Sequence, residues 1–455
     1  MTEAIPVSPA LTVSEALDKW IEAGNEVTRA DILQSMIYLR QRKMFTKALE
    51  LLKWPESIKH LEYSDSYYAS HVDLIARVHG ISKAEIYLQQ IPECSRNEEV
   101  YQALLANCVS TLSCRKAEAL FDKMKKLFHL TSLSCNLLLL LYKKTDRKKI
   151  AGVLLLMEEE NIKPSLLTYQ ILIEVKGQFK DFRGMERILE RMEFEGVEPD
   201  TRFQATLARN YADAGLRDKA EAVLKDMEGG DITKNLSVCR FLLPVYASLG
   251  RGDEVRRIWK VCESNPQVEQ CMAAIEAWGH LKSLEEAEAV FDIMSKNLKR
   301  LSSRHYDALL YVYADHKEVA KGEDLMRRML ESGVTPQPGF WDALVKLYVG
   351  AGEVEKADAV LEHALTQRRG RLYAASFLTI LDQYSKRGDV HNAEKIFFKM
   401  RQAGYFSRMR VYQSLLNAYI NAKAPAYGFI ERMKGDDFVP NQSLAALLAQ
   451  AVAFR

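Results

Sequence analysis

Residues 166–200 read LLTYQILIEVKGQFKDFRGMERILERMEFEGVEPD, and this stretch decides the fold. Apolar side chains keep helical spacing over residues 169–175 and again over residues 185–192, with a polar break between them. The last residues include Gly196, which tolerates a positive φ after a helix end, and Pro199, which cannot continue a helix. The stretch therefore predicts two short amphipathic helices closed by a turn.

Imperfect copies of this helix pair follow one another over residues 29–441, in about twelve units of 32 to 36 residues. A small residue opens the second helix of most units, and a bulky residue, often methionine, follows about two turns later. The small residues are Ala48, Ala84, Ala117, Gly184, Ala220, Ala287, Gly322, Ala357, Ala393 and Gly428. In such an array each pair buries its apolar face against the next pair. The sequence therefore predicts an all-α fold, a right-handed α-solenoid of helix-turn-helix repeats.

The two ends of the chain carry the segments expected to cap this array. Residues 1–28 form an N-terminal segment in which residues 11–23, LTVSEALDKWIEA, have the pattern of an amphipathic helix. Residues 442–455 follow the last unit and predict a C-terminal capping helix. Both caps are expected because the terminal repeats of a solenoid need a polar outer face.

Composition and charge narrow the class of function. The 455 residues are 48% hydrophobic and 27% charged, with a net charge of +2, so the chain as a whole is not a strongly basic body. A site for a polyanion must therefore come from local segregation of charge. The seven cysteines are scattered and form no Cys-x-x-Cys pair, which favours reduced thiols packed in helices over a metal site or a disulfide framework.

Motifs of catalysis and of membrane insertion are missing from the sequence. It has no His-Glu-x-x-His, Walker loop or Gly-x-Ser-x-Gly, and its nine histidines are dispersed. We therefore expect no enzymatic activity, no cofactor, no metal and no small-molecule substrate. The sequence contains no run of 18 apolar residues, so it predicts no membrane-spanning helix. The first ten residues, MTEAIPVSPA, resemble neither a signal peptide nor a transit peptide, so the protein is cytosolic or a presequence has been removed.

The units resemble the 35-residue pentatricopeptide repeat, whose consensus opens with a Thr-Tyr-Asn-like segment and ends in Gly-Ile-x-Pro-Asp. Thr168-Tyr169-Gln170 and residues 196–200 carry this resemblance, as do residues 306–310 and 333–336. The tetratricopeptide repeat is the nearest alternative, but it requires a Trp-x-x-Leu-Gly pattern that no unit shows. The resemblance covers residues 29–441. It implies single-stranded RNA binding in organelles, with the first helix of each unit lining a groove.

In that family the fifth and last residues of a unit contact a base edge, so that each unit reads one nucleotide. The corresponding pairs here are Ala69 with Asn97, Gln102 with Thr131, Asn136 with Ser165, Gln170 with Asp200, Ala205 with Asn235, Arg240 with Gln267, Met272 with Ser302, Asp307 with Gln337, Leu378 with Arg408, and Gln413 with Asn441. The unit that begins at Pro338 has Asp342 at the fifth position, with an uncertain partner near Leu372. Of these pairs, only Asn136 with Ser165 matches the familiar code. The resemblance therefore implies poor sequence readout along most of the array.

Cations on the first helices still allow contacts with RNA phosphates. They lie on these helices or at their ends, whereas acidic residues cluster on several second helices, so we expect a mildly basic concave face. The cations are Lys143, Lys144, Lys176, Arg209, Arg240, Arg304, Lys346, Lys386, Arg387 and Arg410. The alternative is that these charges only solvate exposed helix faces.

The resemblance narrows further to the P-class, which has plain repeats and no appended catalytic domain. Residues 11–54 and 146–169 resemble a plant mitochondrial subgroup that includes integral components of the mitochondrial ribosome. An off-code reading row suits folded rRNA, which is recognised by shape and backbone. We therefore expect a mitochondrial protein of the small ribosomal subunit that contacts rRNA and ribosomal proteins. The alternatives are a factor that stabilises, edits or processes one mRNA, and an adaptor that holds a peptide in the groove.

Overall fold

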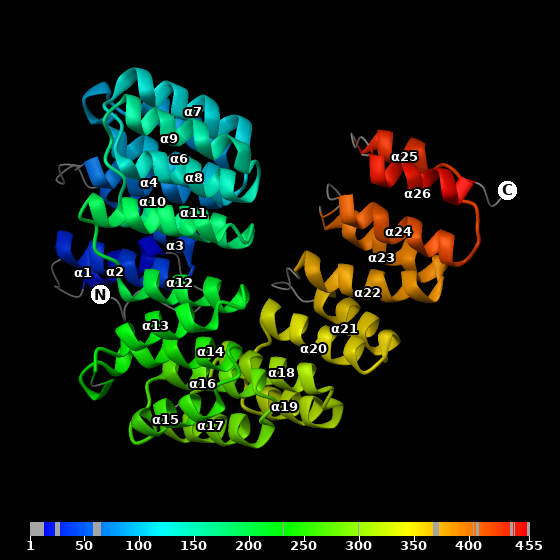
Figure 1. The fold of residues 1–455 in the computed structure, drawn as a ribbon. Helices are drawn as coiled ribbons and strands as arrows, with labels where there is room; N and C mark the ends of the chain where they lie inside the picture. The colour runs from blue at the N-terminus through cyan, green and yellow to red at the C-terminus, as the bar shows by residue number, and fades with distance from the viewer. Residues whose placement is uncertain are drawn as a thin grey trace. The chain divides into compact units, whose positions relative to one another are not determined.

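A computed structural model describes residues 13–22, 28–57, 65–230, 232–298, 300–366, 373–403, 405, 409–436, 440 and 442–452. Within these ranges the chain consists of α-helices, short 3-10 helices and turns, without a strand (Figure 1). The predicted all-α solenoid is confirmed. The chain divides into two compact units, Met1–Pro199 and Asp200–Arg455, which are described separately below.

The first unit contains eleven α-helices in its described residues. They are α1 (Val13–Glu22), α2 (Arg29–Gln41), α3 (Phe45–Ser57), α4 (Asp65–His79), α5 (Ile81–Gln90), α6 (Glu98–Ser110), α7 (Cys114–Leu127), α8 (Ser132–Lys144), α9 (Ile150–Glu159), α10 (Leu166–Gln178) and α11 (Phe182–Phe194), with the 3-10 helices η1 (Glu93–Ser95) and η2 (Arg147–Lys149). The helix expected over residues 11–23 is observed as α1.

The described part of the second unit continues the alternation of first and second helices. It contains α12 (Thr201–Asp213), α13 (Arg217–Glu228), η3 (Ile232–Lys234), η4 (Leu236–Val238), α14 (Cys239–Ser248), α15 (Gly252–Cys262), α16 (Val268–His280), α17 (Leu284–Asn297), α18 (Ser303–His316), α19 (Val319–Glu331), α20 (Pro338–Gly350), α21 (Val354–Thr366), α22 (Ala374–Arg387), α23 (Val390–Gln402), α24 (Met409–Asn421), α25 (Phe429–Gly435) and α26 (Gln442–Val452).

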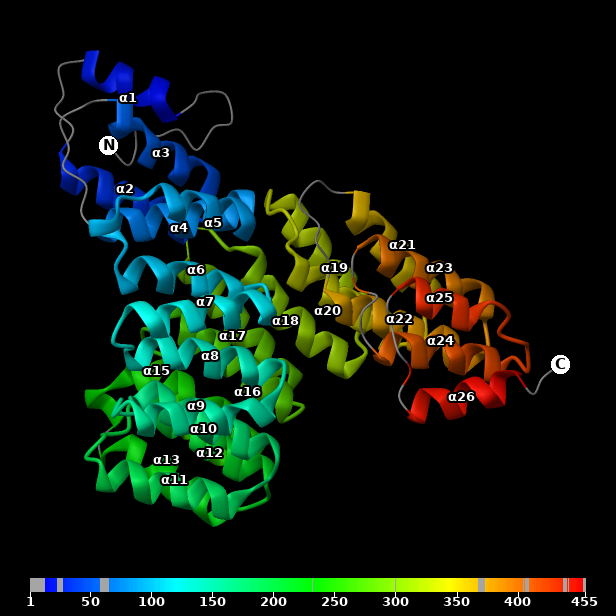
Figure 2. The same cartoon turned by 90° about the horizontal axis from the view of Figure 1, so that it is seen from above.

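The even-numbered helices pack against one another and form a continuous row within each unit. In the first unit α4 contacts α6, α6 contacts α8 and α8 contacts α10. In the second unit the same relation connects α12 with α14, and so on to α24 with α26 (Figures 1 and 2). Each odd-numbered helix from α5 to α23 packs against the first helix of its own repeat. This arrangement leaves one face of the even-numbered row free to form a binding surface.

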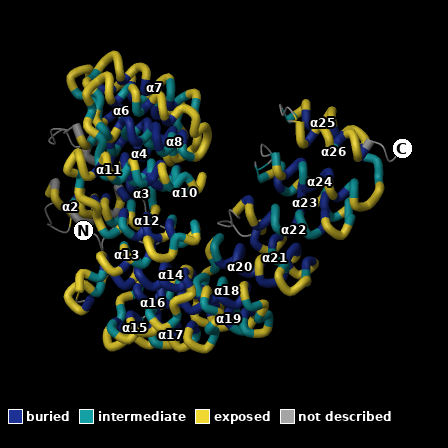
Figure 3. The backbone as a smooth tube through the Cα atoms, viewed as in Figure 1, coloured by how far each residue is buried: buried dark blue, intermediate teal, exposed yellow. Residues whose placement is uncertain are grey.

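The small residues predicted at the start of the second helices lie in the core. Ala84, Ala117, Ala220 and Ala287 are all fully buried. Buried residues are dark blue in Figure 3 and occur along most of the helices. At Gly322 an added Cβ would lie 2.3 Å from Leu347 Cδ2, on the first helix of the next repeat. A larger residue there would force the buried Leu347 side chain to move in the close contact between the two helices.

Tight turns with one left-handed residue end many of the helices. Gly196 has φ +69° directly after α11, as predicted from its place before Pro199. The backbone N–H of Val197 donates to the carbonyl of Met192 at 3.0 Å, which closes the end of the helix. Between α10 and α11 the left-handed residue is Lys180, with φ +55°. The sequence predicted a break there but gave no sign of this conformation.

A recurring polar contact connects consecutive repeats on the side of the second helices. A tyrosine of a first helix and a cation near the next second helix both donate to one glutamate of the preceding second helix, and we call this arrangement the clamp. Its members are Glu118, Tyr142 and Lys149; Glu228, Tyr246 and Arg257; Glu288, Tyr313 and Lys321; Glu323, Tyr348 and Lys356; and Glu394, Tyr419 and Arg432. The tyrosine-to-glutamate distances lie between 2.7 and 3.0 Å.

Candidate nucleic-acid interface

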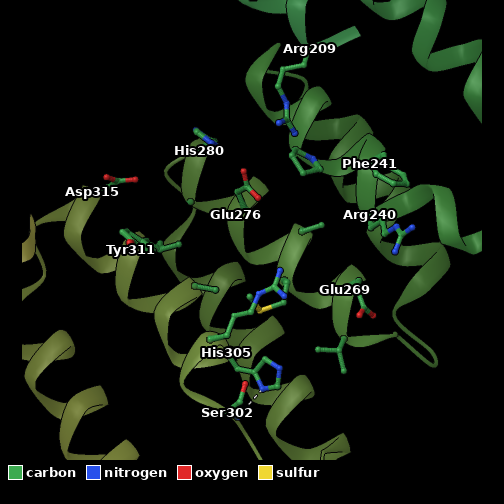
Figure 4. A pocket seen from close by; sticks show the side chains of 18 of the residues that line it. Arg209, Arg240, Phe241, Glu269, Glu276, His280, Ser302, His305, Tyr311 and Asp315 are labelled. Carbon is green, nitrogen blue, oxygen red and sulfur yellow. Dashed lines mark hydrogen bonds between the residues drawn. The ribbon is translucent and has the colours of Figure 1, made fainter. Parts of the chain in front are cut away.

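A groove with a volume of about 960 Å³ runs along the first helices α12 to α20 of the second unit (Figure 4). It is named here the arginine groove, after Arg209, Arg240 and Arg304, which line it. Its other lining residues include Phe241, Pro244, Glu269, Met272, Glu276, His280, His305, Tyr311, Asp315 and Lys346. The groove therefore brings together four of the first-helix cations that the sequence predicted for a basic face.

The repeat spacing explains why these side chains share one groove. Arg209, Pro244, Glu276, Tyr311 and Lys346 follow one another at intervals of 32 to 35 residues, which is one repeat. Because consecutive first helices pack side by side, residues at equivalent positions form a row across the helices. A chain molecule lying in the groove would cross these helices in sequence.

The three arginines keep their positive charges available. Arg209, Arg240 and Arg304 are exposed and form no ion pair with any residue in the described part of the chain. The guanidinium carbon of Arg240 lies 4.6 Å from the centre of the Phe241 ring, which restricts this side chain without neutralising it. Flat guanidinium groups can bind phosphate oxygens through two parallel hydrogen bonds, and these arginines are free to do so.

Negative groups moderate the charge of the groove. Glu269, Glu276 and Asp315 line it and are exposed. The fourth cation, Lys346, forms an ion pair of 3.0 Å with Asp342, so its charge is largely compensated. The positive character of the groove therefore lies at the three arginines.

The two aspartates at fifth positions are not simple exposed carboxylates. Asp342 is 4% exposed, and it accepts hydrogen bonds from the hydroxyls of Tyr311 at 3.0 Å and Ser376 at 2.7 Å, in addition to the Lys346 ion pair. Burial raises the pKa of Asp307 to about 6, although the Ser303 hydroxyl, 3.1 Å away, opposes this shift. Repulsion of a phosphate by Asp342 is therefore weak.

His305 holds the start of α18 and adds little positive charge. The backbone N–H of Ser302 donates to His305 Nδ1 at 3.2 Å, an arrangement that requires this nitrogen to be unprotonated (Figure 4). Burial and the neighbouring Arg304 lower the pKa of His305 below its ordinary value. The ring is therefore neutral at physiological pH.

Asn136 and Ser165, the pair that matches the familiar code, are held by hydrogen bonds within the protein. Asn136 is 1% exposed, and its side-chain N–H donates to Ser165 Oγ at 2.9 Å. The Thr168 hydroxyl donates to the Asn136 carbonyl oxygen at 2.7 Å. Gln102 likewise donates to Thr131 at 3.0 Å. For both pairs, contact with a base would require these internal hydrogen bonds to open.

Gln170 and Asp200, the pair of the best-formed unit, also have structural partners. The Gln170 side-chain N–H donates to Glu174 at 3.5 Å, which is a long hydrogen bond. Asp200 accepts from the backbone N–H of Phe203 at 2.7 Å and caps the start of α12. Of the other last residues named above, Arg408 and Asn441 lie outside the described residues.

The remaining predicted cations fall into two groups, apart from Lys176, which forms an ion pair with Asp181 of its own repeat at 2.6 Å. Lys143 forms an ion pair with Glu174, Arg387 with Glu355 at 2.7 Å, and Arg410 with Asp382 at 3.0 Å. Lys144 and Lys386 are exposed and make no ion pair within the described ranges. The structure therefore separates cations that hold neighbouring repeats together from cations that are free to meet a ligand.

Most of the cysteines lie in the core and do not form a metal site with other described residues. Cys108, Cys135, Cys239, Cys262 and Cys271 are buried free thiols, as the sequence predicted. In the part of the chain that the structure describes, no cluster of at least three potential metal ligands occurs. No helix described here has the length and apolar character needed to cross a bilayer.

Comparison with known proteins places this array in a family. The pentacotripeptide-repeat region of PRORP matches residues 82–283, and the PPR repeat matches residues 304–334 and 375–405. Two Arabidopsis thaliana proteins are similar along the whole chain. The pentatricopeptide repeat-containing protein At1g80270, mitochondrial, is 53% identical, with 100% of this chain and 76% of the relative covered. The pentatricopeptide repeat-containing protein At1g15480, mitochondrial, is 50% identical, with 100% of this chain and 77% of the relative covered.

The chain belongs to the pentatricopeptide-repeat family, which confirms the resemblance seen in its repeats. Both relatives are named mitochondrial, and the mitochondrial location predicted from the sequence is confirmed by them. A solved structure, the pentatricopeptide repeat protein PPR10 from maize, is 21% identical with a TM-score of 0.39. The match covers 100% of this chain, and this chain spans 65% of the length of that protein.

Proposed function

We propose that this protein is a non-catalytic RNA-binding protein that holds a single-stranded RNA segment in the arginine groove. The observation that carries the proposal is the set of unpaired guanidinium groups of Arg209, Arg240 and Arg304, which lie on three first helices of one groove, α12, α14 and α18. Three cations spread along one groove suit the phosphates of a chain molecule. Membership of the pentatricopeptide-repeat family supports the same function.

The RNA is recognised mainly through its backbone and shape. Asn136, the fifth-position residue of the pair that fits the familiar code, is buried and hydrogen-bonded to Ser165 and Thr168. Ala205 and Met272 at other fifth positions lack the hydrogen-bonding groups that base reading needs. Such a protein suits a folded RNA of fixed structure. The finer proposal is therefore a structural role on rRNA in the mitochondrial small ribosomal subunit, in contact with ribosomal proteins, rather than processing of one mRNA.

Salt-dependent binding tests the groove. A labelled 20-nucleotide RNA of mixed sequence is titrated with the full chain between 50 and 200 mM salt, and binding is followed by fluorescence anisotropy. Three phosphate contacts to single-stranded RNA give a slope of about −2 in log affinity against log salt, or a fall of roughly 20-fold over this range. In the double variant Arg240→Gln and Arg304→Gln the slope becomes about −0.7, and the fall is roughly threefold.

The matched control is Arg327→Gln. Arg327 is an exposed arginine of the second helix α19 that forms an ion pair with Asp324, and it lies outside the groove. This variant is expected to bind RNA like the unmodified chain. Equal salt slopes for the double variant and the control, with intact helical circular dichroism, would refute the arginine groove as the RNA site.

Gradient sedimentation of mitochondrial extract tests the ribosomal proposal. We expect the tagged chain to comigrate with the small subunit at moderate salt and to be released by nuclease. A free pool bound to one transcript would favour the mRNA-specific alternative, while the binding measurement with purified RNA would still stand.

A further inference from the structure

The clamp is absent from the seam between α9 and α11 in the first unit. By the repeat alignment, Ala151 occupies the place that Glu118 has one repeat earlier, and Lys176 occupies the place of Tyr142. Lys176 forms its ion pair with Asp181, 2.6 Å away, in the turn before α11 of its own repeat. Neither the glutamate acceptor nor the tyrosine donor of the clamp is therefore present at this seam.

A small apolar pocket lies at this seam, where no clamp residue places a polar group in its wall. It has a volume of about 290 Å³ and lies between α9, α10 and α11, wholly within the first unit. Leu154, Met157, Leu172 and Ile188 form its apolar lining, and three of them remain partly exposed while Met157 is buried. The equivalent seam at α17 to α19 also has a pocket, of about 400 Å³, but its walls carry the clamp residues Glu288, Tyr313 and Lys321 and are therefore more polar.

Basic residues outnumber acidic residues among the side chains that line this pocket. Lys176, Arg187 and Arg191 stand on its rim, opposite the single acidic residue Glu158. Lys176 and Arg191 each have an acidic partner, Asp181 and Glu195 respectively. Arg187 is exposed and forms no ion pair with any described residue; its Nε donates only to the carbonyl of Arg183, at 3.3 Å.

We propose that the α9–α11 seam is a docking site for a protein partner that inserts one large apolar side chain flanked by acidic residues. The apolar lining fits the side chain, and the cationic rim fits carboxylates on either side of it. Buried apolar anchors surrounded by a polar rim are the usual source of affinity in such contacts. Exposed apolar residues continue on the same two helices, Leu155 at 58% exposure and Phe194 at 90%.

The chemistry of the pocket favours a peptide over RNA. A nucleotide in the pocket would place its base and sugar polar groups against Leu154, Leu172 and Ile188, which offer no hydrogen bonds. Most of the pocket surface is apolar, whereas the arginine groove combines apolar and polar walls. The seam and the arginine groove are therefore assigned to different partners, and the proposal stands whether or not the groove binds RNA.

Selection of short peptides tests the docking site without a known partner. Random 16-residue peptides displayed on phage are selected on the immobilised full chain in the presence of excess single-stranded RNA. We expect enriched peptides to contain an aromatic or leucine residue with acidic neighbours, and the synthesised peptide to bind with a dissociation constant of about 1 to 100 µM. Failure to enrich such peptides overturns the proposal.

Variants of the seam locate the binding. Ala151→Glu combined with Lys176→Tyr restores two members of the clamp and is expected to weaken peptide binding at least tenfold, because it removes a rim cation and places a carboxylate beside the apolar lining. Arg187→Glu changes an exposed residue and is expected to weaken it about fivefold while leaving the helical circular dichroism unchanged. The control is Phe398→Glu, a change at an exposed apolar residue of α23 in the other unit, which is expected to leave peptide binding intact.

Other occupants of the seam give distinct results. If unlabelled RNA displaces the peptide and Ala151→Glu with Lys176→Tyr lowers RNA affinity, the seam is an RNA site and the proposal is wrong. If sedimentation shows a dimer that Arg187→Glu converts to a monomer, a second copy of the chain occupies the seam, which also overturns it. Unchanged peptide affinity in both seam variants, with folding intact, rejects the pocket as the docking site.

Discussion

Removal of one hydroxyl at a clamp should measure how strongly neighbouring repeats are coupled. The Tyr313 hydroxyl, on a side chain that is 5% exposed, donates to Glu288 at 3.0 Å, and Lys321 donates to the same carboxylate oxygen at 2.8 Å. Burial and the Glu288 carboxylate raise the pKa of Tyr313, so it remains a protonated donor throughout the physiological range. Tyr313→Phe removes this hydrogen bond without removing the ring from the core.

The expected cost follows from the type of hydrogen bond. A hydrogen bond to a charged group contributes roughly 1.5 to 3 kcal/mol to stability. Glu288 is partly exposed and keeps its ion pair with Lys321 in the variant, so the lower value applies. We expect Tyr313→Phe to lower the free energy of unfolding by about 1.5 kcal/mol, which is roughly a tenfold change in the unfolding equilibrium.

Tyr384→Phe supplies the matched control. Tyr384 occupies the equivalent place in α22 and is 2% exposed, but its hydroxyl makes no hydrogen bond with any described residue. Its loss should change the free energy of unfolding by less than about 0.5 kcal/mol. Urea denaturation of both variants, followed by circular dichroism at 222 nm, gives the comparison. Equal stabilities of Tyr313→Phe and Tyr384→Phe would refute the view that the clamp couples the repeats.

Three further changes have expected outcomes. Asp307 has a folded pKa of about 6, above its ordinary value of 3.8, so the folded state binds the proton more tightly and stability falls as pH rises from about 4 to 6. In urea denaturation at pH 4.5 and 7.5, the fall in the free energy of unfolding between the two pH values should therefore be smaller by about 1 kcal/mol in Asp307→Asn, after allowance for solvent screening. An unchanged fall would contradict the role of Asp307. Gly322→Ala should cost about 1 to 3 kcal/mol, because its Cβ would overlap Leu347, and a stability equal to the unmodified chain would show that the helices can separate freely. Gly152→Ala, where the Cβ meets nothing within 4 Å, should instead stabilise α9 by roughly 0.5 to 1 kcal/mol in the same assay.

The fold was predictable because it depends on local, repeated patterns. Small residues such as Ala117 and Ala287 recur where two helices meet, and apolar spacing identifies both helices of each repeat. The left-handed conformation of Lys180 was not predictable in the same way, because glycine is the usual residue for a positive φ. The division of the chain after Pro199 also left no mark in the sequence that separates it from other repeat boundaries.

The site was predictable only in part, because the sequence shows charges but not their partners. Arg240 and Arg304 were placed correctly on first helices, and the structure brings them into one groove with Arg209. Nothing in their sequence neighbourhood distinguishes them from Arg387, whose acidic partner Glu355 lies 32 residues away. A search for acids about one repeat before each cation would have found several clamps. It would not have found the buried network around Asn136, which depends on side-chain direction.

A polar side chain of this protein can bind a ligand only where it is not already bonded to another residue of the chain. In the first unit, polar side chains of first helices bond to the next helix, as Gln102 does to Ser134 and Asn136 to Ser165. Each such bond stabilises the stack and removes a group from recognition. Around Arg240 the coupling of repeats is supplied on the opposite side by the clamp of Glu228 and Tyr246. The Arg240 guanidinium itself forms no ion pair with any described residue, so its charge can act on a partner without the loss of a contact between repeats.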